Sequence, residues 1–185
     1  MRNGIIVLGF FIIVLILTAG CTSAQSGDTN VKTTPTYDSI GYHSLDPLQF
    51  QKFFPNIPGW QMDKPFIITA KSSSPNIMAG YGNSENHHVV HVLFRDLGPY
   101  SNSYLNSNTQ NRIINFHGYP AVKVSGDIDI ADDRGMGVYI KINSRLAVEI
   151  NADGLISENY SLSDADADIE TFANAIDFNG FAALV

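Results

Sequence analysis

Three histidines within five residues form the stretch of this sequence whose side chains could most readily do chemistry. His87, His88 and His91 occur as His-His-Val-Val-His. On a helix, His87 and His91 would share a face and could bind zinc. The β-branched neighbours favour a strand, on which residues four apart lie about 13 Å apart, too far to share one metal ion. A zinc site would therefore need a residue from a neighbouring strand, and His117 is the candidate histidine.

Two acidic runs carry the oxygen atoms that calcium prefers, but neither has the spacing of a calcium-binding loop. The first run occupies residues 127–133 and has Ala131 where that loop needs its third acidic or amide side chain. The second run occupies residues 164–168 and is followed by Ile169 where the loop needs glycine. We therefore expect the first run on a solvated strand face. We expect the second at the start of a helix, where the helix dipole favours negative charge.

Other motifs that carry chemistry are missing from the sequence. It contains no G-x-S-x-G nucleophile turn, no P-loop and no dinucleotide-binding pattern. Gly80-Tyr81-Gly82 and Gly135-Met136-Gly137 are too short to hold a phosphate group, and we interpret both as turns or bulges. We therefore predict a protein without catalytic residues, a bound metal or another cofactor.

Cys21 is the only cysteine, and it follows a short apolar segment. Residues 5–17 are Ile, Val, Leu or Phe except for Gly9, and Arg2 is the only charged residue before Cys21. A positive start, an apolar run shorter than the ~20 residues of a spanning helix, and a small-residue end are typical of an export signal. Residues 17–21, Leu-Thr-Ala-Gly-Cys, resemble the lipobox of prokaryotic membrane lipoproteins, with Thr18 where Leu is commonest. The resemblance implies cleavage after Gly20, lipidation of Cys21 and anchoring at the extracytoplasmic face of the cell membrane.

An uncleaved N-terminal membrane helix is the alternative interpretation, and it too places the rest of the chain outside the cytoplasm. Loss of Arg2 with the signal leaves 10 of the 11 Lys and Arg against 18 Asp and Glu, so the net charge changes from −7 to −8. Such an acidic chain lacks the basic surface that binds phosphates, and we expect no nucleic-acid partner. Because no cysteine follows Cys21, the domain has no internal disulfide.

The chain divides into a signal, a tether and one domain. Residues 1–20 are the predicted signal peptide. Residues 21–44 begin with the lipidated cysteine, are rich in Ser and Thr and lack apolar periodicity, which predicts a disordered tether. Residues 45–185 are enough for a single domain with its own core.

A helix is predicted at each end of this domain. Asp46 can cap a helix whose first turn contains Pro47 and which ends before Pro55. At the other end, residues 163–177 place Ile169, Phe172, Ala173 and Ile176 at i, i+3, i+4 and i+7, the spacing of one buried stripe. Asn179-Gly180 is expected to end that helix.

Strands are predicted between the helices. Residues 87–96 are apolar on both faces, which indicates a central strand. Residues 120–150 alternate between apolar and polar in three runs, which predicts an antiparallel meander with one dry and one wet face. We place Val122 and Val124 on the dry face, and Lys123 and Glu149 on the wet face.

These elements predict an α+β domain with a mostly antiparallel sheet of about five to seven strands, on which an N-terminal and a C-terminal helix pack. The order of elements over residues 45–184 resembles that of the Mog1/PsbP-like α/β/α sandwich. Because this resemblance rests on element order, it assigns no functional residue.

We interpret the chain as a membrane-anchored extracytoplasmic lipoprotein whose domain is a non-enzymatic binding or structural module for a protein or small-molecule partner. The alternative is an extracytoplasmic metal-binding protein or metallohydrolase that uses His87, His91 and His117. A glycan-binding module that uses Trp60 or the tyrosines near residue 100 is a third hypothesis. Asn159-Tyr160-Ser161 is an N-glycosylation sequon, so Asn159 is a candidate acceptor in a host that glycosylates exported proteins.

Overall fold

The computed structural model describes residues 43–68, 76–98, 104–105, 112–128 and 133–185. The predicted signal, Cys21 and nearly all of the tether lie outside the described residues. Among the described residues, no helix combines the length and the apolar character that crossing a membrane requires.

The centre of the domain is one antiparallel sheet of eight strands in the order β1-β3-β4-β8-β7-β6-β5, with β2 also paired to β3. The strands are β1 (Trp60–Met62), β2 (Phe66–Ile68), β3 (Asn76–Asn83), β4 (Val89–Asp96), β5 (Ile113–Phe116), β6 (Tyr119–Ile128), β7 (Asp133–Lys141) and β8 (Leu146–Leu155). The α+β class is confirmed, and the sheet has one strand more than the expected upper number. Strand β4 lies between β3 and β8, so its predicted central place is confirmed.

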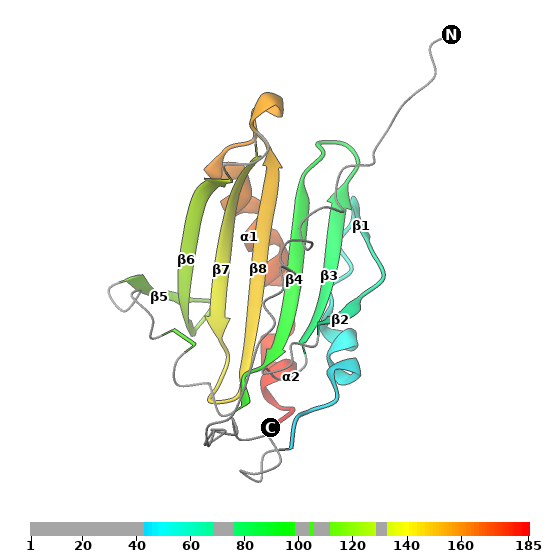
Figure 1. Cartoon of the computed structure of the whole chain (residues 1–185), viewed down its shortest axis with the longest axis vertical. Helices are drawn as coiled ribbons and strands as arrows, with labels where there is room; N and C mark the ends of the chain where they lie inside the picture. The colour runs from blue at the N-terminus through cyan, green and yellow to red at the C-terminus, as the bar shows by residue number, and fades with distance from the viewer. Residues whose placement is uncertain (1–42, 69–75, 99–103, 106–111, 129–132) are drawn as a thin grey trace, which may run out of the picture. The chain divides into compact units, whose positions relative to one another are not determined.

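Helices cover one face of this sheet (Figure 1). Helix α1 (Leu162–Ala175) packs on β7 and β8, and the 3-10 helix η2 (Pro47–Phe53) packs on β3 and β4. The short helix α2 (Phe178–Ala182) follows α1. Figure 1 views the sheet from its other side, where the described residues include no helix. We call this side the open face.

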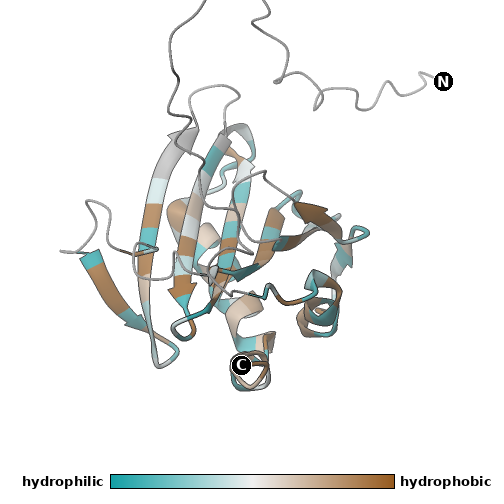
Figure 2. Ribbon diagram, turned by 60° about the horizontal axis from the view of Figure 1, so that its bottom comes forward, coloured by the Kyte–Doolittle hydropathy of each residue, from teal (hydrophilic) through white to brown (hydrophobic). Residues whose placement is uncertain are grey.

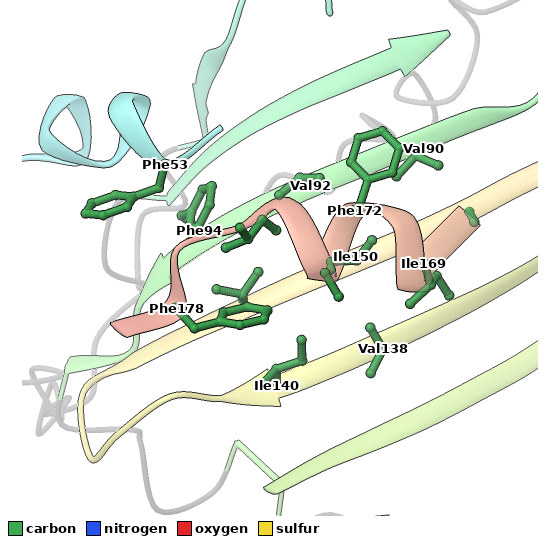
Figure 3. Close-up of a cluster of buried hydrophobic side chains, with 14 of the residues drawn as sticks. Phe53, Val90, Val92, Phe94, Val138, Ile140, Ile150, Ile169, Phe172 and Phe178 are labelled. Carbon is green, nitrogen blue, oxygen red and sulfur yellow. The ribbon is translucent and has the colours of Figure 1, made fainter. Parts of the chain in front are cut away.

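Aromatic side chains fill the space between the sheet and the helices (Figure 3). The ring of Phe181 from α2 lies 5.2 Å from Phe50 of η2 and 4.9 Å from Phe94 of β4. On α1, the ring of Phe172 lies 4.7 Å from Tyr81 and 5.0 Å from Trp60. Each fully buried ring contributes roughly 1.5–3 kcal/mol through loss of its exposed apolar surface. Trp60 is partly buried and packs against this core.

The N-terminal helix differs from the expected one in type. Asp46 caps it as predicted and accepts a hydrogen bond from the backbone N–H of Leu48 at 2.9 Å. The helix is a 3-10 helix of seven residues, Pro47–Phe53. Prolines at both ends explain its shortness, because Pro47 opens the first turn and Pro55 cannot continue the helix.

The C-terminal helix confirms the predicted stripe. Ser161 caps α1, and the Ser161 hydroxyl and Asp164 carboxylate form a reciprocal capping box. Ile169 and Phe172 are fully buried, and Figure 3 shows their side chains between the helix and the sheet. The expected break at Asn179-Gly180 is wrong: both residues lie inside α2, whose cap is Asp177.

The three predicted strands of the meander are present as β6, β7 and β8. In β6, however, the residues predicted on the dry face lie on the open face, and those predicted on the wet face lie on the helix side. Val138 and Ile150 are fully buried and point toward α1 (Figure 3), and Figure 2 shows the alternating hydropathy along the strands. Lys123 pairs with Val138 across the sheet and forms an ion pair with Asp166 of α1, so it lies on the helix side. Val122 and Val124 lie on the other side, where Val124 is 45% exposed, opposite to its predicted dry place, whereas Val122 is only 3% exposed and thus buried as predicted. Helix α1 packs on β7 and β8, and toward β6 it presents Asp166 and Glu170, which pair with Lys123.

Candidate functional site

The three histidines of the His-His-Val-Val-His run point to three different places. His87 precedes β4 in a left-handed conformation with φ of 58°, and its Nδ1 lies 2.9 Å from the carboxylate of Glu158. The side chain of His88 lies on the helix side, where its Nδ1 is 2.9 Å from Asp168 Oδ2. His91 lies on the open face, with its Nδ1 3.7 Å from Asp153 Oδ2. Residues this close in sequence separate because β-strand side chains alternate between faces.

His117 is also paired elsewhere. Its Nε2 lies 2.8 Å from Glu170 Oε2 of α1. The structure therefore does not bring His87, His91 and His117 together. In the part of the chain that the structure describes, no three His, Cys, Asp or Glu residues form a group that could hold a metal ion.

The acidic residues at the start of α1 also have separate roles. Asp164 completes the capping box, and the hydrogen bonds from Ser161 lower the pKa of its carboxyl. Asp166 forms an ion pair with Lys123, while Asp168 binds His88. These three different partners account for the positions of the three carboxylates without a bound calcium ion. The side chains of the first acidic run, residues 127–133, lie outside the described residues.

A row of polar and very small residues crosses the centre of the open face. Gly80 on β3 pairs with His91 on β4. His91 pairs with Asn151 on β8, and Asn151 with Gly137 on β7. The register is unbroken through all four strands, so two polar side chains stand side by side with a glycine on each flank.

The next row repeats this arrangement. Gly82 pairs with Val89, Val89 with Asp153, and Asp153 with Gly135. His91, Asn151 and Asp153, together with the flanking glycines Gly80, Gly82, Gly135 and Gly137, form what we call the His91 site. Neither glycine pair is a turn or a bulge, so that interpretation is wrong: both pairs lie inside strands of continuous register.

The glycines of β7 leave room for the polar side chains of β8 to lie flat. A Cβ on Gly137 would stand 2.4 Å from Asn151 Oδ1, and a Cβ on Gly135 would stand 2.3 Å from Asp153 Oδ1. Both distances are far shorter than van der Waals contact. On the other flank, a Cβ on Gly82 would meet no heavy atom within 4 Å. Glycine inside a strand weakens the sheet and often marks a place where a ligand or another backbone comes close.

Asp63, from the segment between β1 and β2, extends the His91 site at its β3 edge. Its backbone N–H donates to the Gly80 carbonyl at 2.8 Å. Its Oδ2 and the Nε2 of His91 lie 3.3 and 3.6 Å from the position of a Cβ on Gly80. The side chain of His91 is 38% exposed and that of Asp153 is 30% exposed. The site therefore presents an imidazole, an amide and two carboxylates to solvent on a nearly flat floor.

A buried ionic cluster borders the His91 site along the strands. Glu149 was predicted on a wet face, but it is only 5% exposed. Arg95 Nη2 donates to its Oε2 at 3.0 Å, and the Tyr104 hydroxyl donates to its Oε1 at 2.9 Å. Burial and the neighbouring Glu149 charge raise the pKa of Tyr104 well above its ordinary value. The wet-face prediction for Glu149 is wrong because Tyr104 and Arg95 cover it.

Sequence reasoning found His91 but missed the residues around it. The signal was present: in each Gly-x-Gly pair the spacing of two puts both glycines on the same strand face. Asn151 and Asp153 have the same spacing on β8. What pattern analysis could not supply was the order of strands, which places the two glycine pairs on either side of β4 and β8.

A second feature lies on the helix side, at the two-residue turn between β5 and β6. An open depression of about 500 Å³ is lined there by His117 and Tyr119 and by residues at the end of α1 and the start of α2. The candidate acceptor Asn159 is exposed, with φ of 64°, whereas Tyr160 is 3% exposed. Most of the loop that carries Tyr100 lies outside the described residues.

No protein-family model, curated protein or solved structure matches this chain. The resemblance of residues 17–21 to a lipobox, and of the element order to the Mog1/PsbP-like sandwich, both stay predictions.

Proposed function

We propose that this chain is a membrane-anchored extracytoplasmic lipoprotein that binds a ligand or partner at the His91 site, without catalysis. The anchor part is supported by the apolar segment and by Cys21 directly after Thr18-Ala19-Gly20. A thioether lipid with a second acyl chain gives durable attachment, whereas one chain alone is marginal.

The observation that carries the binding part is the pair of glycines on each side of His91, Asn151 and Asp153. Four glycines on one face of two strands lower the stability of the sheet. Because they have no side chains, they leave His91, Asn151 and Asp153 accessible from the solvent on the open face. A ligand that lies across β4 and β8 could thus reach all three side chains without displacing another side chain.

The proposal of binding without catalysis rests first on the sequence, which contains no recognised catalytic motif, and the spacing at His91 agrees with it. A carboxylate that orients a catalytic imidazole does so through a hydrogen bond of about 2.6–3.2 Å. At the His91 site the corresponding distance is 3.7 Å. The tighter pair, His88 with Asp168, joins β4 to α1 on the helix side.

The anchor is tested by producing the full chain and its Cys21→Ser variant in a bacterial host with labelled palmitate. We expect the label and membrane fractionation for the wild type only, and an intact mass that corresponds to cleavage after Gly20 plus lipid. An unmodified thiol on an uncleaved chain would contradict the proposal.

The binding part is tested by titrating a fragment library against the full chain while its backbone glycine amides are observed by NMR. Ligands of the His91 site should shift the amides of Gly80 and Gly137, leave that of Gly59 unchanged, and lose affinity in Asn151→Ala. A broad hydrolase screen is the counter-test. Turnover that His91→Ala abolishes would show an enzyme instead.

A further inference from the structure

The depression beside the β5–β6 turn has the size of a small-molecule site. Its volume of about 500 Å³ lies within the range of roughly 300–1,000 Å³ that such sites occupy. Three segments line it: His117 and Tyr119 from the turn, Asn174 from α1, and Phe178 and Asn179 from α2. It lies on the helix side of the sheet, apart from the His91 site on the open face.

His117 stands in this depression with a positive φ, which is uncommon for a residue other than glycine. His117 and Gly118 have φ of 51° and 89°, the two positive values of a type I′ hairpin turn. Asn, Asp or Gly is the favoured first residue of that turn, and the turn itself needs no imidazole. Strained residues of this kind concentrate at functional sites. The ring is held in place, since Nε2 lies 2.8 Å from Glu170 Oε2.

The lining of the depression is mostly polar, with a smaller apolar part. Phe178 and Ile176, which are 7% and 6% exposed, contribute to that apolar part. The ring of Tyr119 lies 5.7 Å from that of Phe178, and its hydroxyl donates to Asn179 Oδ1 at 3.0 Å. Because the amide oxygen of Asn179 accepts this bond, its NH₂ group is directed to another acceptor. Asn174 is exposed on the rim.

Saccharides match this combination. A pyranose ring has an apolar C–H face that packs on aromatic rings and a hydroxyl edge that bonds to amides, carboxylates and imidazole. The charged groups beside the depression are Asp177 on its lining and Glu170 behind His117, where Lys123 pairs with Glu170 and with Asp166. Three carboxylates against one ammonium leave this edge net negative, which disfavours an acidic sugar, and the carboxylates can accept hydrogen bonds from a neutral one. We propose that the depression binds a neutral saccharide through Tyr119, Asn174 and Asn179.

The test uses the full chain purified in a polyoxyethylene detergent, because sugar-based detergents would compete. Saturation-transfer NMR is recorded with glucose, galactose, N-acetylglucosamine and their β-1,4-linked disaccharides, and with glucuronic acid as the acidic comparison. We expect transfer to at least one neutral sugar. Asn174→Ala and Tyr119→Phe should weaken its affinity by about five- to tenfold, the effect of one lost hydrogen bond.

Asn56→Ala is the matched control, since Asn56 is exposed and lies outside the depression. It should leave affinity unchanged, and circular dichroism should show all three variants folded. Absence of transfer from every neutral sugar would overturn the proposal. Unchanged affinity in both depression variants, or tighter binding of glucuronic acid, would also overturn it. Each result is independent of ligand binding at the His91 site.

Discussion

His88 Nδ1 lies 2.9 Å from Asp168 Oδ2, which joins the start of β4 to the middle of α1 across 80 residues of sequence. The Tyr160 hydroxyl donates to the same carboxylate oxygen at 3.2 Å, and its ring packs edge-on against His88 at 4.5 Å. The side chains of His88 and Asp168 are only 18% and 14% exposed. Burial raises the pKa of Asp168, although His88 opposes the shift.

Replacement of Asp168 by Asn should therefore change how stability depends on pH. Because folding raises the pKa of Asp168, the folded chain binds this proton more tightly than the unfolded chain. Its contribution to the free energy of unfolding thus falls as pH rises from the ordinary value of 3.8 through the raised one. Asn cannot titrate, and its amide oxygen can still accept one of the two hydrogen bonds.

Urea unfolding at about pH 3.5 and about pH 6 checks this prediction. The free energy of unfolding of the wild type, minus that of Asp168→Asn, should be larger at the lower pH than at the higher pH. Parallel pH profiles for the two proteins would mean that Asp168 does not titrate differently on folding.

Gly137→Ala should reveal the close approach of Asn151. A new Cβ would stand 2.4 Å from Asn151 Oδ1, so that side chain must move. Asn151→Ala removes the side chain that the new Cβ would meet. The effect of Gly137→Ala on the free energy of unfolding should therefore be more favourable by about 1 kcal/mol in Asn151→Ala than in the wild type. A double-mutant cycle measured by urea denaturation gives this coupling.

Gly82→Ala is the control for that cycle, because its Cβ would meet no heavy atom within 4 Å. It should stabilise the strand by about 0.5–1 kcal/mol and show no coupling to Asn151→Ala. Equal coupling at both glycines would indicate that the arrangement of Asn151 over Gly137 is wrong.

Arg95→Met should destabilise the domain by about 3–5 kcal/mol, because it leaves the charge of Glu149 buried without its cation. The double variant Arg95→Met/Glu149→Leu should recover most of this loss, since no charge is left buried. Thermal and urea unfolding measure both variants. If the single and double variants were equally unstable, lost packing and not the unpaired carboxylate would be the cause.

Ser161→Ala should cost about 1 kcal/mol by removing the hydroxyl half of the capping box of α1. The pKa of Asp164 should also rise toward its ordinary value, because the hydrogen bond from the Ser161 side chain is the main cause of its depression. The cost should be present above the ordinary Asp pKa and shrink as pH falls through the lowered value.

Ser163→Ala is the matched control, since Ser163 is exposed in the first turn of the same helix. Its effect should remain within about 0.5 kcal/mol. NMR titration of the Asp164 carboxyl in the two variants separates the cap from a general serine effect.

Local patterns in the sequence predicted the helices and strands in which buried residues recur at the period of that element. The stripe on α1, the central strand β4 and the inward residues of β7 and β8 each follow from the period of a helix or a strand. The cap at Asp46 likewise depends only on its immediate neighbours. These features needed no knowledge of which strand lies beside which.

Only the tertiary structure decided which strand faces are covered and which side chains meet. Val124 is exposed because it lies on the open face of β6, and Lys123, on the opposite face, reaches Asp166 of α1. Glu149 is buried because Arg95 and Tyr104 reach it from other segments. The two glycine pairs frame His91 because β3 and β7 flank β4 and β8, and long-range strand order of this kind is not encoded in the spacing of residues along one strand.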